Sequence, residues 1–186
     1  MIVLMGKSSS GKDRILNELI KKHGYKKVVR YTTRPRRKGE KDGDTYHYIS
    51  VDDFKQKIHD DFFVEWKDYS TVEGIWYYGT SLEDVKNADD KTAIILPPDR
   101  YKEVKNTDNK FTSIYIYANN ATLKNRLNKR GDNKEEAKRR LEHDNEDFKG
   151  AEYLADKIVY NNDGTNINDV INKILEFIGG EILRVI

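Results

Sequence analysis

Short apolar runs and amphipathic stretches alternate along most of this chain. Residues 2–5, 92–96, 112–117 and 156–160 are apolar and rich in β-forming residues, which is typical of buried strands. Helical patterns separate these runs, and the last one, at about residues 166–179, carries its apolar residues along one stripe. Strands that alternate with helices predict an α/β fold with a parallel sheet flanked by helices.

The first predicted helix begins soon after the first strand. Apolar residues recur there at helical spacing, at Ile15, Leu16, Leu19 and Ile20, and Gly24 follows as a stop signal. Two further helical patterns lie near residues 99–107 and 121–149. Residues 119–149 are strongly charged with few large apolar groups, so they are either a mobile helical flap or a set of solvated helices.

Residues 30–81 break this alternation. The segment is rich in Tyr, Thr, Arg and Asp, and it contains no clear βαβ unit. Within it, Ser50 is a suitable helix N-cap, and Asp53 stands where a side chain can reach back, as in a shorter variant of the capping box. We interpret residues 30–81 as a lobe inserted into the α/β core.

The composition narrows the classes of function. The chain has 186 residues, enough for one domain with an inserted lobe, and 35% of them are charged while 37% are hydrophobic. A net charge of +2 is too small for the whole surface to attract a polyanion. The chain has no cysteine, which excludes disulfides, thiolate zinc sites and a cysteine nucleophile. The apolar run at residues 2–5 is too short for a signal sequence or a membrane span, so we expect a soluble cytoplasmic protein.

A glycine-rich loop follows the first predicted strand. Four residues separate Gly6 from Gly11, and Lys12 then opens the predicted helix. The loop contains three consecutive serines, Ser8, Ser9 and Ser10. Glycines let the main chain approach an anion, and consecutive N–H groups at a helix N-terminus hold phosphate oxygens. The loop therefore predicts a nucleotide phosphate site with Lys12 on the β- and γ-phosphates, and the alternative is a tight turn with an exposed lysine.

Asp13 departs from the usual phosphate loop, which has Ser or Thr after the lysine to bind Mg²⁺. A carboxylate is also a hard oxygen ligand, but it adds negative charge beside a polyphosphate. Asp13 also suits the first turn of a helix as a purely structural residue. We expect rearranged or impaired metal binding at Asp13 rather than complete loss of the site.

A second candidate anion site lies within residues 30–50. Its basic residues are Arg30, Arg34, Arg36, Arg37 and Lys38. Guanidinium forks suit a phosphate dianion, whereas Glu40 adds an acceptor that could take the N1–H and N2–H₂ donors of guanine. The alternative is a solvated basic loop that binds nucleic acid or nothing, although no second basic stripe supports nucleic acid.

Several motifs in sequence order resemble the guanylate kinase family. "TTRPRRKGEKDGDTYHYISVDDF" (32–54) is similar to its TTR-x-PR-x-GE stretch, and "FFVEW" (62–66) is similar to its F-x-EW motif. "YYGTS" (77–81) resembles its YYG-[ST] motif, and "LKNRLNKRG" (123–131) resembles its lid arginine segment. The resemblance covers nearly the whole chain, and several agreeing motifs are more specific than the loop alone.

This resemblance implies a P-loop NTPase-type parallel sheet flanked by helices, in one domain with three parts. These are a core of residues 1–29, 82–119 and 150–186, a GMP-binding lobe of residues 30–81 and a helical lid of residues 120–149. It implies ATP-dependent phosphorylation of GMP or dGMP with Mg²⁺. The expected partners are small nucleotides, without nucleic acid or membrane, and the expected state is a monomer or homodimer.

On the acceptor side, the resemblance implies that Arg34 and Arg37 clamp the GMP phosphate, to which Tyr46 and Tyr78 also donate hydrogen bonds. Glu40 would support these arginines and face the nucleotide. For the base, it implies that Glu65 accepts from guanine N1–H and N2–H₂ and that Thr80 contacts the ring. The alternatives are ordinary lobe tyrosines and a surface ion pair between Glu65 and Lys67.

On the donor side, the resemblance assigns the glycine-rich loop to the phosphates of ATP, with Asn161 or Asn162 near the adenine. It assigns three lid arginines to the transferring phosphate: Arg126, Arg130 and Arg140. The loop assignment includes Gly6, Gly11, Lys12 and the three serines between them, with Asp13 as the possible metal ligand. In a chain this charged, a solvated helix face is the alternative for each lid arginine.

Two further departures from the family pattern lie near the ligands. Pro97 replaces an expected Asp, which leaves Asp99 to orient magnesium-bound water or a lid arginine. Arg30 stands where the family often has a small hydroxyl residue, so it adds charge near the acceptor phosphate or crowds the base. Pro97 and Arg30 leave open the alternative of a kinase of another monophosphate or phosphorylated small molecule. Asp13 leaves open a second alternative, a catalytically weak binding module.

Overall fold

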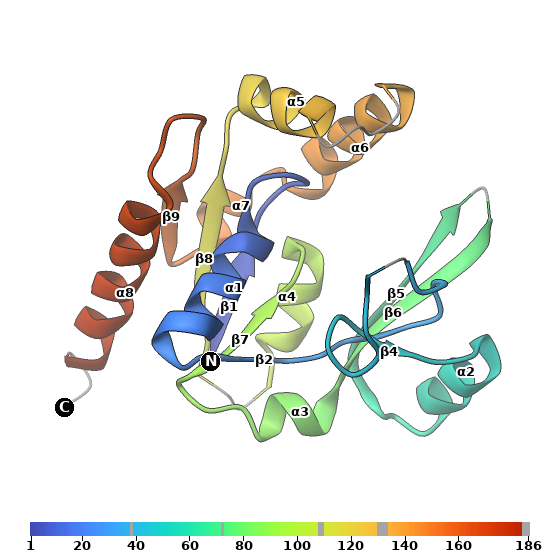
Figure 1. Cartoon of the computed structure of the whole chain (residues 1–186). Coiled ribbons are helices and arrows are strands. Elements are labelled where there is room, and N and C mark those ends of the chain that lie inside the picture. The colour runs from blue at the N-terminus through green and yellow to red at the C-terminus, as the bar shows by residue number, and fades with distance from the viewer. Residues whose placement is uncertain (38, 72, 108–109, 130–133, 184–186) are drawn as a thin grey trace.

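Two β-sheets organise the chain, and they differ in size and strand direction (Figure 1). The computed structural model describes residues 1–37, 39–71, 73–107, 110–129 and 134–183. A five-stranded sheet has the order β2-β7-β1-β8-β9, and a four-stranded sheet has the order β4-β3-β6-β5. Every strand pair of the larger sheet is parallel, which confirms the predicted α/β fold.

The larger sheet contains the four apolar runs that were predicted to be strands. They are β1 (Ile2–Met5), β7 (Thr92–Ile95), β8 (Thr112–Tyr117) and β9 (Lys157–Tyr160). The fifth strand, β2 (Lys26–Lys27), has only two lysines and pairs with β7 at the edge of the sheet. A strand this short and polar has no recognisable pattern in the sequence.

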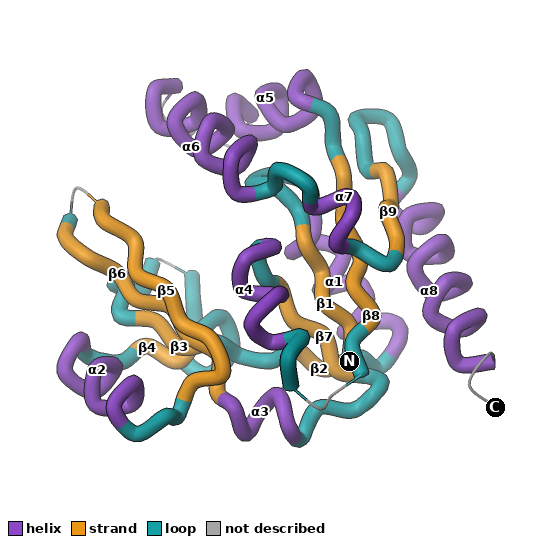
Figure 2. The backbone as a smooth tube through the Cα atoms, turned by 180° about the vertical axis from the view of Figure 1, so that it is seen from behind, coloured by secondary structure: helices purple, strands orange, loops and turns teal. Residues whose placement is uncertain are grey.

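Helices cover both faces of the larger sheet (Figure 2). Along β1, Ile2 and Leu4 pack in one apolar cluster while Val3 and Met5 pack in another, because successive side chains point to opposite faces. The first cluster includes residues of α1 (Lys12–His23) and α8 (Ile167–Leu183). The second includes residues of α3 (Leu82–Lys86), α4 (Pro98–Val104) and α7 (Ala151–Leu154). Burial on both faces explains why the strands are continuous apolar runs.

The smaller sheet lies within residues 30–81, the segment interpreted as an inserted lobe. It is built from β3 (Tyr31–Thr32), β4 (His47–Tyr48), β5 (Phe63–Thr71) and β6 (Gly74–Ser81). The helix α2 (Val51–His59) begins at Ser50, whose hydroxyl accepts from the Asp53 N–H at 3.0 Å, so the predicted N-cap is confirmed. The Asp53 carboxylate accepts from the Ser50 hydroxyl at 2.6 Å.

The charged stretch near residues 121–149 contains two helices, α5 (Asn120–Lys129) and α6 (Lys134–Asp147). They lie beyond the carboxyl end of β8 (Figure 1). Four buried apolar residues join them to the end of β8: Ala118, Leu123, Leu127 and Leu141. This cluster is small, because most other positions of α5 and α6 are polar.

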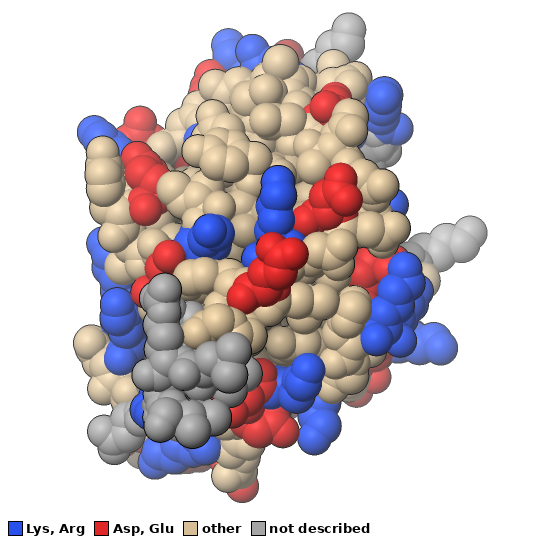
Figure 3. Space-filling model, turned by 90° about the vertical axis from the view of Figure 1, so that its left-hand side faces the viewer, with Lys and Arg blue, Asp and Glu red and all other residues tan. Residues whose placement is uncertain are grey.

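The outer surface carries both signs of charge. On the face that Figure 3 shows, acidic and basic side chains are interspersed rather than gathered in a basic stripe. Among the described residues, no helix combines the length and the apolar character that crossing a membrane requires.

Candidate active site

The candidate donor site lies at the carboxyl edge of the larger sheet. The loop that starts at Gly6 directly follows β1, Pro97 follows β7 by two residues, and Asn161 directly follows β9. Carboxyl ends of parallel strands meet at one edge, which is where α/β proteins bind their ligands. The helices α5 and α6 lie beyond this edge (Figure 1).

The glycine-rich loop follows a tight path into α1. Ser9 has a φ of 62° and Gly11, the N-cap of α1, has a φ of 97°, so both residues are left-handed. A Cβ atom on Gly6 would lie 2.5 Å from the Ser10 hydroxyl oxygen and 2.9 Å from the Ile116 carbonyl oxygen. Glycine is therefore required at position 6 for the loop to pack against β8.

Two side chains from outside the loop hold its carbonyl groups. The Asn161 amide donates to the Ser10 carbonyl at 2.7 Å. Arg126 donates to the carbonyls of Ser9 and Ser10 at 3.2 and 3.3 Å, and its Nε donates to Asp163 at 3.1 Å. Of the two candidate asparagines, Asn161 thus contacts the loop, and Asp163 is a contact that the sequence analysis missed.

The lid arginines are only partly described. Arg126 reaches the loop at its carbonyl groups, so the structure does not place it at the amide side where phosphate would bind. Arg130 and the side chain of Arg140 lie outside the described residues. Their predicted contact with the transferring phosphate stays a prediction.

Lys12 and Asp13 differ in exposure although they are neighbours. The Lys12 ammonium lies over the loop, 3.4 Å from the Lys7 carbonyl oxygen, and its side chain is 18% exposed. The Asp13 carboxylate is 82% exposed and lies 4.0 Å from the Lys12 ammonium. An exposed hard oxygen donor on the first turn of α1 fits a magnesium ion that also binds polyphosphate and water.

Asp99, the second metal candidate, is engaged by basic side chains. The Lys67 ammonium donates to it at 3.0 Å, and Arg100 lies 3.3 Å away. Burial opposes ionisation of Asp99, but the hydrogen bond and charge of Lys67 lower its pKa overall. Within the described part of the chain, no three His, Asp or Glu side chains are placed to hold a metal. Asp99 therefore fits a direct metal ligand less well than Asp13 does.

The helix α6 also contacts the loop directly. The Ser8 N–H donates to the Asp144 carboxylate at 2.6 Å, and the Lys7 ammonium donates to the Asn145 side-chain oxygen at 2.7 Å. Sequence analysis missed both contacts, because Asp144 is one of many acidic residues in α6 and no motif includes it. A carboxylate on a loop amide has the chemistry of a phosphate oxygen at that position.

Arg34 is held by Glu40 within the lobe of residues 30–81. The Arg34 guanidinium is buried and donates to both carboxylate oxygens at 2.8 and 3.0 Å. The Arg37 N–H and the Tyr48 hydroxyl donate to the same carboxylate at 2.8 and 2.7 Å. Partial burial would raise the pKa of Glu40, but these hydrogen bonds outweigh it and lower the pKa to about 2. Glu40 is thus the support for Arg34 that the resemblance implies.

Tyr46 and Tyr78 lie beside Arg34. Their rings are 5.7 Å apart, and the Arg34 guanidinium lies 5.6 Å from the Tyr46 ring centre. Burial raises the pKa of Tyr46. The side chain of Arg37, by contrast, is exposed.

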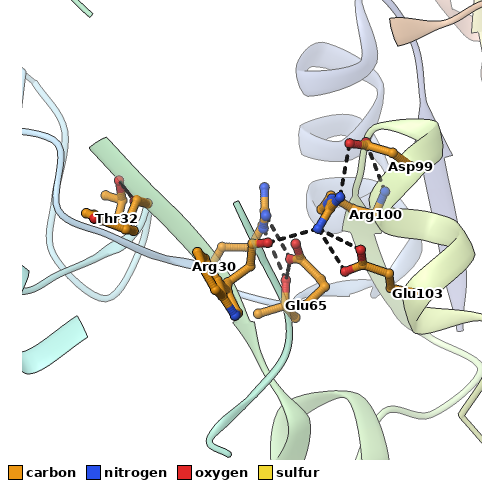
Figure 4. A network of polar contacts seen from close by, with 9 residues as sticks. Arg30, Thr32, Glu65, Asp99, Arg100 and Glu103 are labelled. Carbon is orange, nitrogen blue, oxygen red and sulfur yellow. Dashed lines mark hydrogen bonds and ion pairs between the residues drawn. The ribbon is translucent and has the colours of Figure 1, made fainter. Parts of the chain in front are cut away.

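Glu65 lies at the buried end of β5, next to Thr80 of β6. Its carboxylate accepts from Arg30 at 2.7 Å and also from the Thr80 hydroxyl. The proposed surface pair with Lys67 is wrong, because Glu65 is buried and Lys67 pairs with Asp99. Figure 4 shows this network between the lobe and α4.

Comparisons with known proteins agree on one family. The family model described as guanylate kinase matches residues 1–180. A guanylate kinase of Clostridium tetani is 31% identical over 189 residues, which cover 100% of this chain and 88% of that protein. A guanylate kinase of Pseudoalteromonas translucida is 35% identical over 141 residues, or 73% of this chain and 66% of that protein.

A solved structure supports the fold. The crystal structure of guanylate kinase from Anaplasma phagocytophilum matches with a TM-score of 0.67 at 18% identity. The match covers 97% of this chain and 85% of that one. Both sheets and the helices that flank the larger one therefore belong to a known arrangement.

Proposed function

The chain belongs to the guanylate kinase family, and from this premise we propose that it transfers the γ-phosphoryl group of ATP to GMP or dGMP. The observation that carries the proposal is the arrangement of two anion sites. A glycine-rich loop lies at the carboxyl edge of the larger sheet, and the buried Arg34 with its two tyrosines lies in the lobe, which contacts the core through Lys67 and Asp99.

The loop and Lys12 would hold the donor. The loop amides and the N-terminus of α1 would bind the ATP phosphates, while Asn161 and Arg126 keep the opposite, carbonyl side of the loop in place. Lys12 would neutralise charge on the phosphates. Mg²⁺, when bound, would neutralise charge between the phosphates, and the exposed carboxylate of Asp13 would hold it directly or through water.

The acceptor phosphate would bind to Arg34, whose orientation is set by Glu40. Burial raises the pKa of Tyr46, so this hydroxyl keeps its proton. Tyr46 and the neighbouring Tyr78 would both donate to the same phosphate. The attacking oxygen of a phosphate is already negatively charged, so no general base is needed. Alignment and charge stabilisation would then account for most of the rate.

The lid and lobe would enclose the nucleotides. We propose that residues 30–81 and 120–149 approach the core when both nucleotides are bound, which excludes water and suppresses hydrolysis of ATP. Arg126, Arg130 and Arg140 stay the predicted lid residues. For Arg126, reaching the transferring phosphate requires exchange of its bonds to Asp163 and the loop carbonyls.

The test is turnover of purified protein. With ATP and Mg²⁺, we expect ADP release with GMP and dGMP and little release with AMP, UMP or CMP. Replacement Lys12→Ala should lower kcat by at least about a hundredfold, because the charge on the transferring group loses its lysine. Lys21→Ala, an exposed lysine at the other end of α1, is the matched control. Activity that survives Lys12→Ala would contradict the assignment, and binding of GMP without any turnover would favour a binding module.

The cytoplasm stays the predicted location, and a monomer or homodimer stays the predicted assembly. Nucleic acid is not expected as a partner.

A further inference from the structure

We propose that Arg30 is a specificity-determining residue that reads the purine together with Glu65. This inference rests on the proposed function and deepens it. It states that the Arg30–Glu65 pair accepts a 6-oxopurine but discriminates weakly between guanine and hypoxanthine.

Arg30 binds the carboxylate of the candidate base site directly. Its Nη2 donates to Oε1 of Glu65 at 2.7 Å, and its Nε donates to the Thr80 hydroxyl at 3.1 Å. The Thr80 hydroxyl donates to the same Oε1. Two donors therefore occupy one oxygen of Glu65 (Figure 4).

The other oxygen of this carboxylate has no donor. The Glu65 side chain is 0% exposed, and its Oε2 has no hydrogen-bond partner among the described residues. A buried carboxylate oxygen without a donor is costly, and such an atom at a candidate site points to a ligand that supplies the missing N–H. Glu65 thus has one oxygen left for a base instead of two.

Among the described residues, the other basic side chains near Glu65 have carboxylate partners of their own and do not bind Glu65. Arg34 is bound to Glu40, and Lys67 is bound to Asp99. The Arg30 side chain is 15% exposed, so it retains access to the space next to Glu65. The pair therefore offers guanidinium N–H donors beside a carboxylate acceptor.

The edge of a 6-oxopurine complements this pair. Guanine and hypoxanthine both have an O6 acceptor next to an N1–H donor, which match Arg30 and Oε2 of Glu65. Adenine has the opposite order, with a donor at N6 and an acceptor at N1, so it is rejected. The exocyclic N2 amino group, which only guanine has, needs the second carboxylate oxygen, and Arg30 occupies that oxygen.

The experiment compares GMP with IMP in wild type, Arg30→Ser and Arg30→Gln. For each protein, kcat/KM is measured with ATP and Mg²⁺, and Kd is measured calorimetrically without ATP. We expect the GMP-to-IMP ratio to rise about tenfold or more in Arg30→Ser, because Oε1 becomes free for the N2 amino group. Arg30→Gln should shift the ratio in the same direction, since it removes the ion pair but keeps a side chain of similar length.

The control is Arg14→Ser, which removes an exposed arginine from α1 and should leave the GMP-to-IMP ratio unchanged. An unchanged ratio in folded Arg30 variants would overturn the inference, as would an equal loss for both substrates, which would assign Arg30 to the phosphate. If wild type turns over no monophosphate, the proposed function is wrong, but the ratio of Kd values for GMP and IMP still tests the role of Arg30. If Arg30→Ser does not fold, the GMP-to-IMP ratio of Arg30→Gln tests the inference.

Discussion

At the scale of single residues, the candidate acceptor site depends on Glu40 as much as on the arginine that would touch the phosphate. Glu40 accepts hydrogen bonds from Arg34, from the Arg37 main chain and from Tyr48. Burial and the hydrogen bond to Glu40 also raise the pKa of Tyr48 to about 12, so this hydroxyl stays a donor across the physiological range. The carboxylate therefore fixes Arg34 before any nucleotide binds.

Replacement Glu40→Gln should remove stability in a pH-dependent way. The folded pKa of about 2 lies below the ordinary value of 4.5, so the unfolded chain binds the proton first as the pH falls. The stability from Glu40 is thus fully present above about pH 4.5 and is lost as the pH falls toward about 2. We expect the difference in urea midpoint between wild type and Glu40→Gln to shrink between about pH 5 and pH 3. A constant difference would contradict this role.

Asp13 gives a second prediction for a single residue. Replacement Asp13→Ser should lower KM for ATP by about twofold to fivefold, since it removes an exposed negative charge beside the phosphates. It should also lower the Mg²⁺ concentration for half-maximal activity, because a hydroxyl is the usual ligand at this position. Titrations of ATP and of Mg²⁺ in the turnover assay check both effects. Loss of activity in Asp13→Ser would instead identify Asp13 as the required metal ligand.

At the scale of elements, the contact between α6 and the glycine-rich loop would compete with ATP at the proposed donor site. Asp144 occupies the N–H of Ser8, and Asn145 holds Lys7. An ATP phosphate that binds this N–H has to displace the carboxylate. Because this contact has to break first, the observed Kd for ATP would be higher than it would be without the contact.

Replacement Asp144→Ala should therefore tighten ATP binding. We expect a decrease in Kd of about threefold to tenfold by calorimetry, which corresponds to one hydrogen bond to a charged group in a partly exposed setting. Glu146→Ala, an exposed acidic residue on the same helix, is the control for a change of charge alone. Equal effects of the two replacements would indicate simple electrostatics, and weaker binding in Asp144→Ala would show that Asp144 assists the nucleotide.

The strands differ in how clearly the sequence predicts them. The strands β1 and β8 are covered by helices on both faces, so their residues form continuous apolar runs that stand out. The strands β3 and β4 have two residues each, which is too short for any periodicity. The long strand β5 has the sequence FVEWKDYST, and its burial does not alternate regularly, so the lobe could be recognised only as an interruption.

The candidate site also has parts that the sequence predicts and parts that it does not. The phosphate loop could be predicted because residues 6–12 carry the whole pattern in one segment. The Arg30–Glu65 pair joins residues 35 positions apart, and the Ser8–Asp144 contact joins residues 136 positions apart. Nothing in either segment identifies its partner, because such contacts are set by how the lobe and α6 pack on the core.

At the scale of the whole molecule, the lobe is joined to the core by polar contacts near α4. Lys67 of β5 donates to Asp99, and Arg100 donates to the Trp66 carbonyl at 2.9 Å. Val64 of β5 also packs against an apolar cluster of the core. Figure 4 shows Arg100 with its partners Asp99 and Glu103 on the core side of this connection. Exchange of the polar bonds would allow a change in the angle between the two sheets.

The radius of gyration should decrease when both nucleotides bind. We expect this contraction in small-angle X-ray scattering with GMP and a non-hydrolysable ATP analogue, and a smaller one with the analogue alone. CMP in place of GMP is the control, because we expect the smaller pyrimidine ring not to reach Glu65. An unchanged radius with both nucleotides would mean that the unliganded arrangement is already closed.

One face of β5 connects the candidate base site with the contact between the lobe and the core. Glu65, Lys67 and Tyr69 occupy alternate positions, so they lie on the same side of the strand. Glu65 belongs to the candidate base site, Lys67 binds Asp99 of the core, and Tyr69 lies beside Tyr78. If a purine binds at Glu65 as proposed, a shift of Glu65 would be carried along the hydrogen-bonded strand to Lys67, two residues away. We expect binding of the correct base to alter the contact between β5 and α4 through the main chain of β5. Recognition of the base would then favour the approach of the lobe to the core.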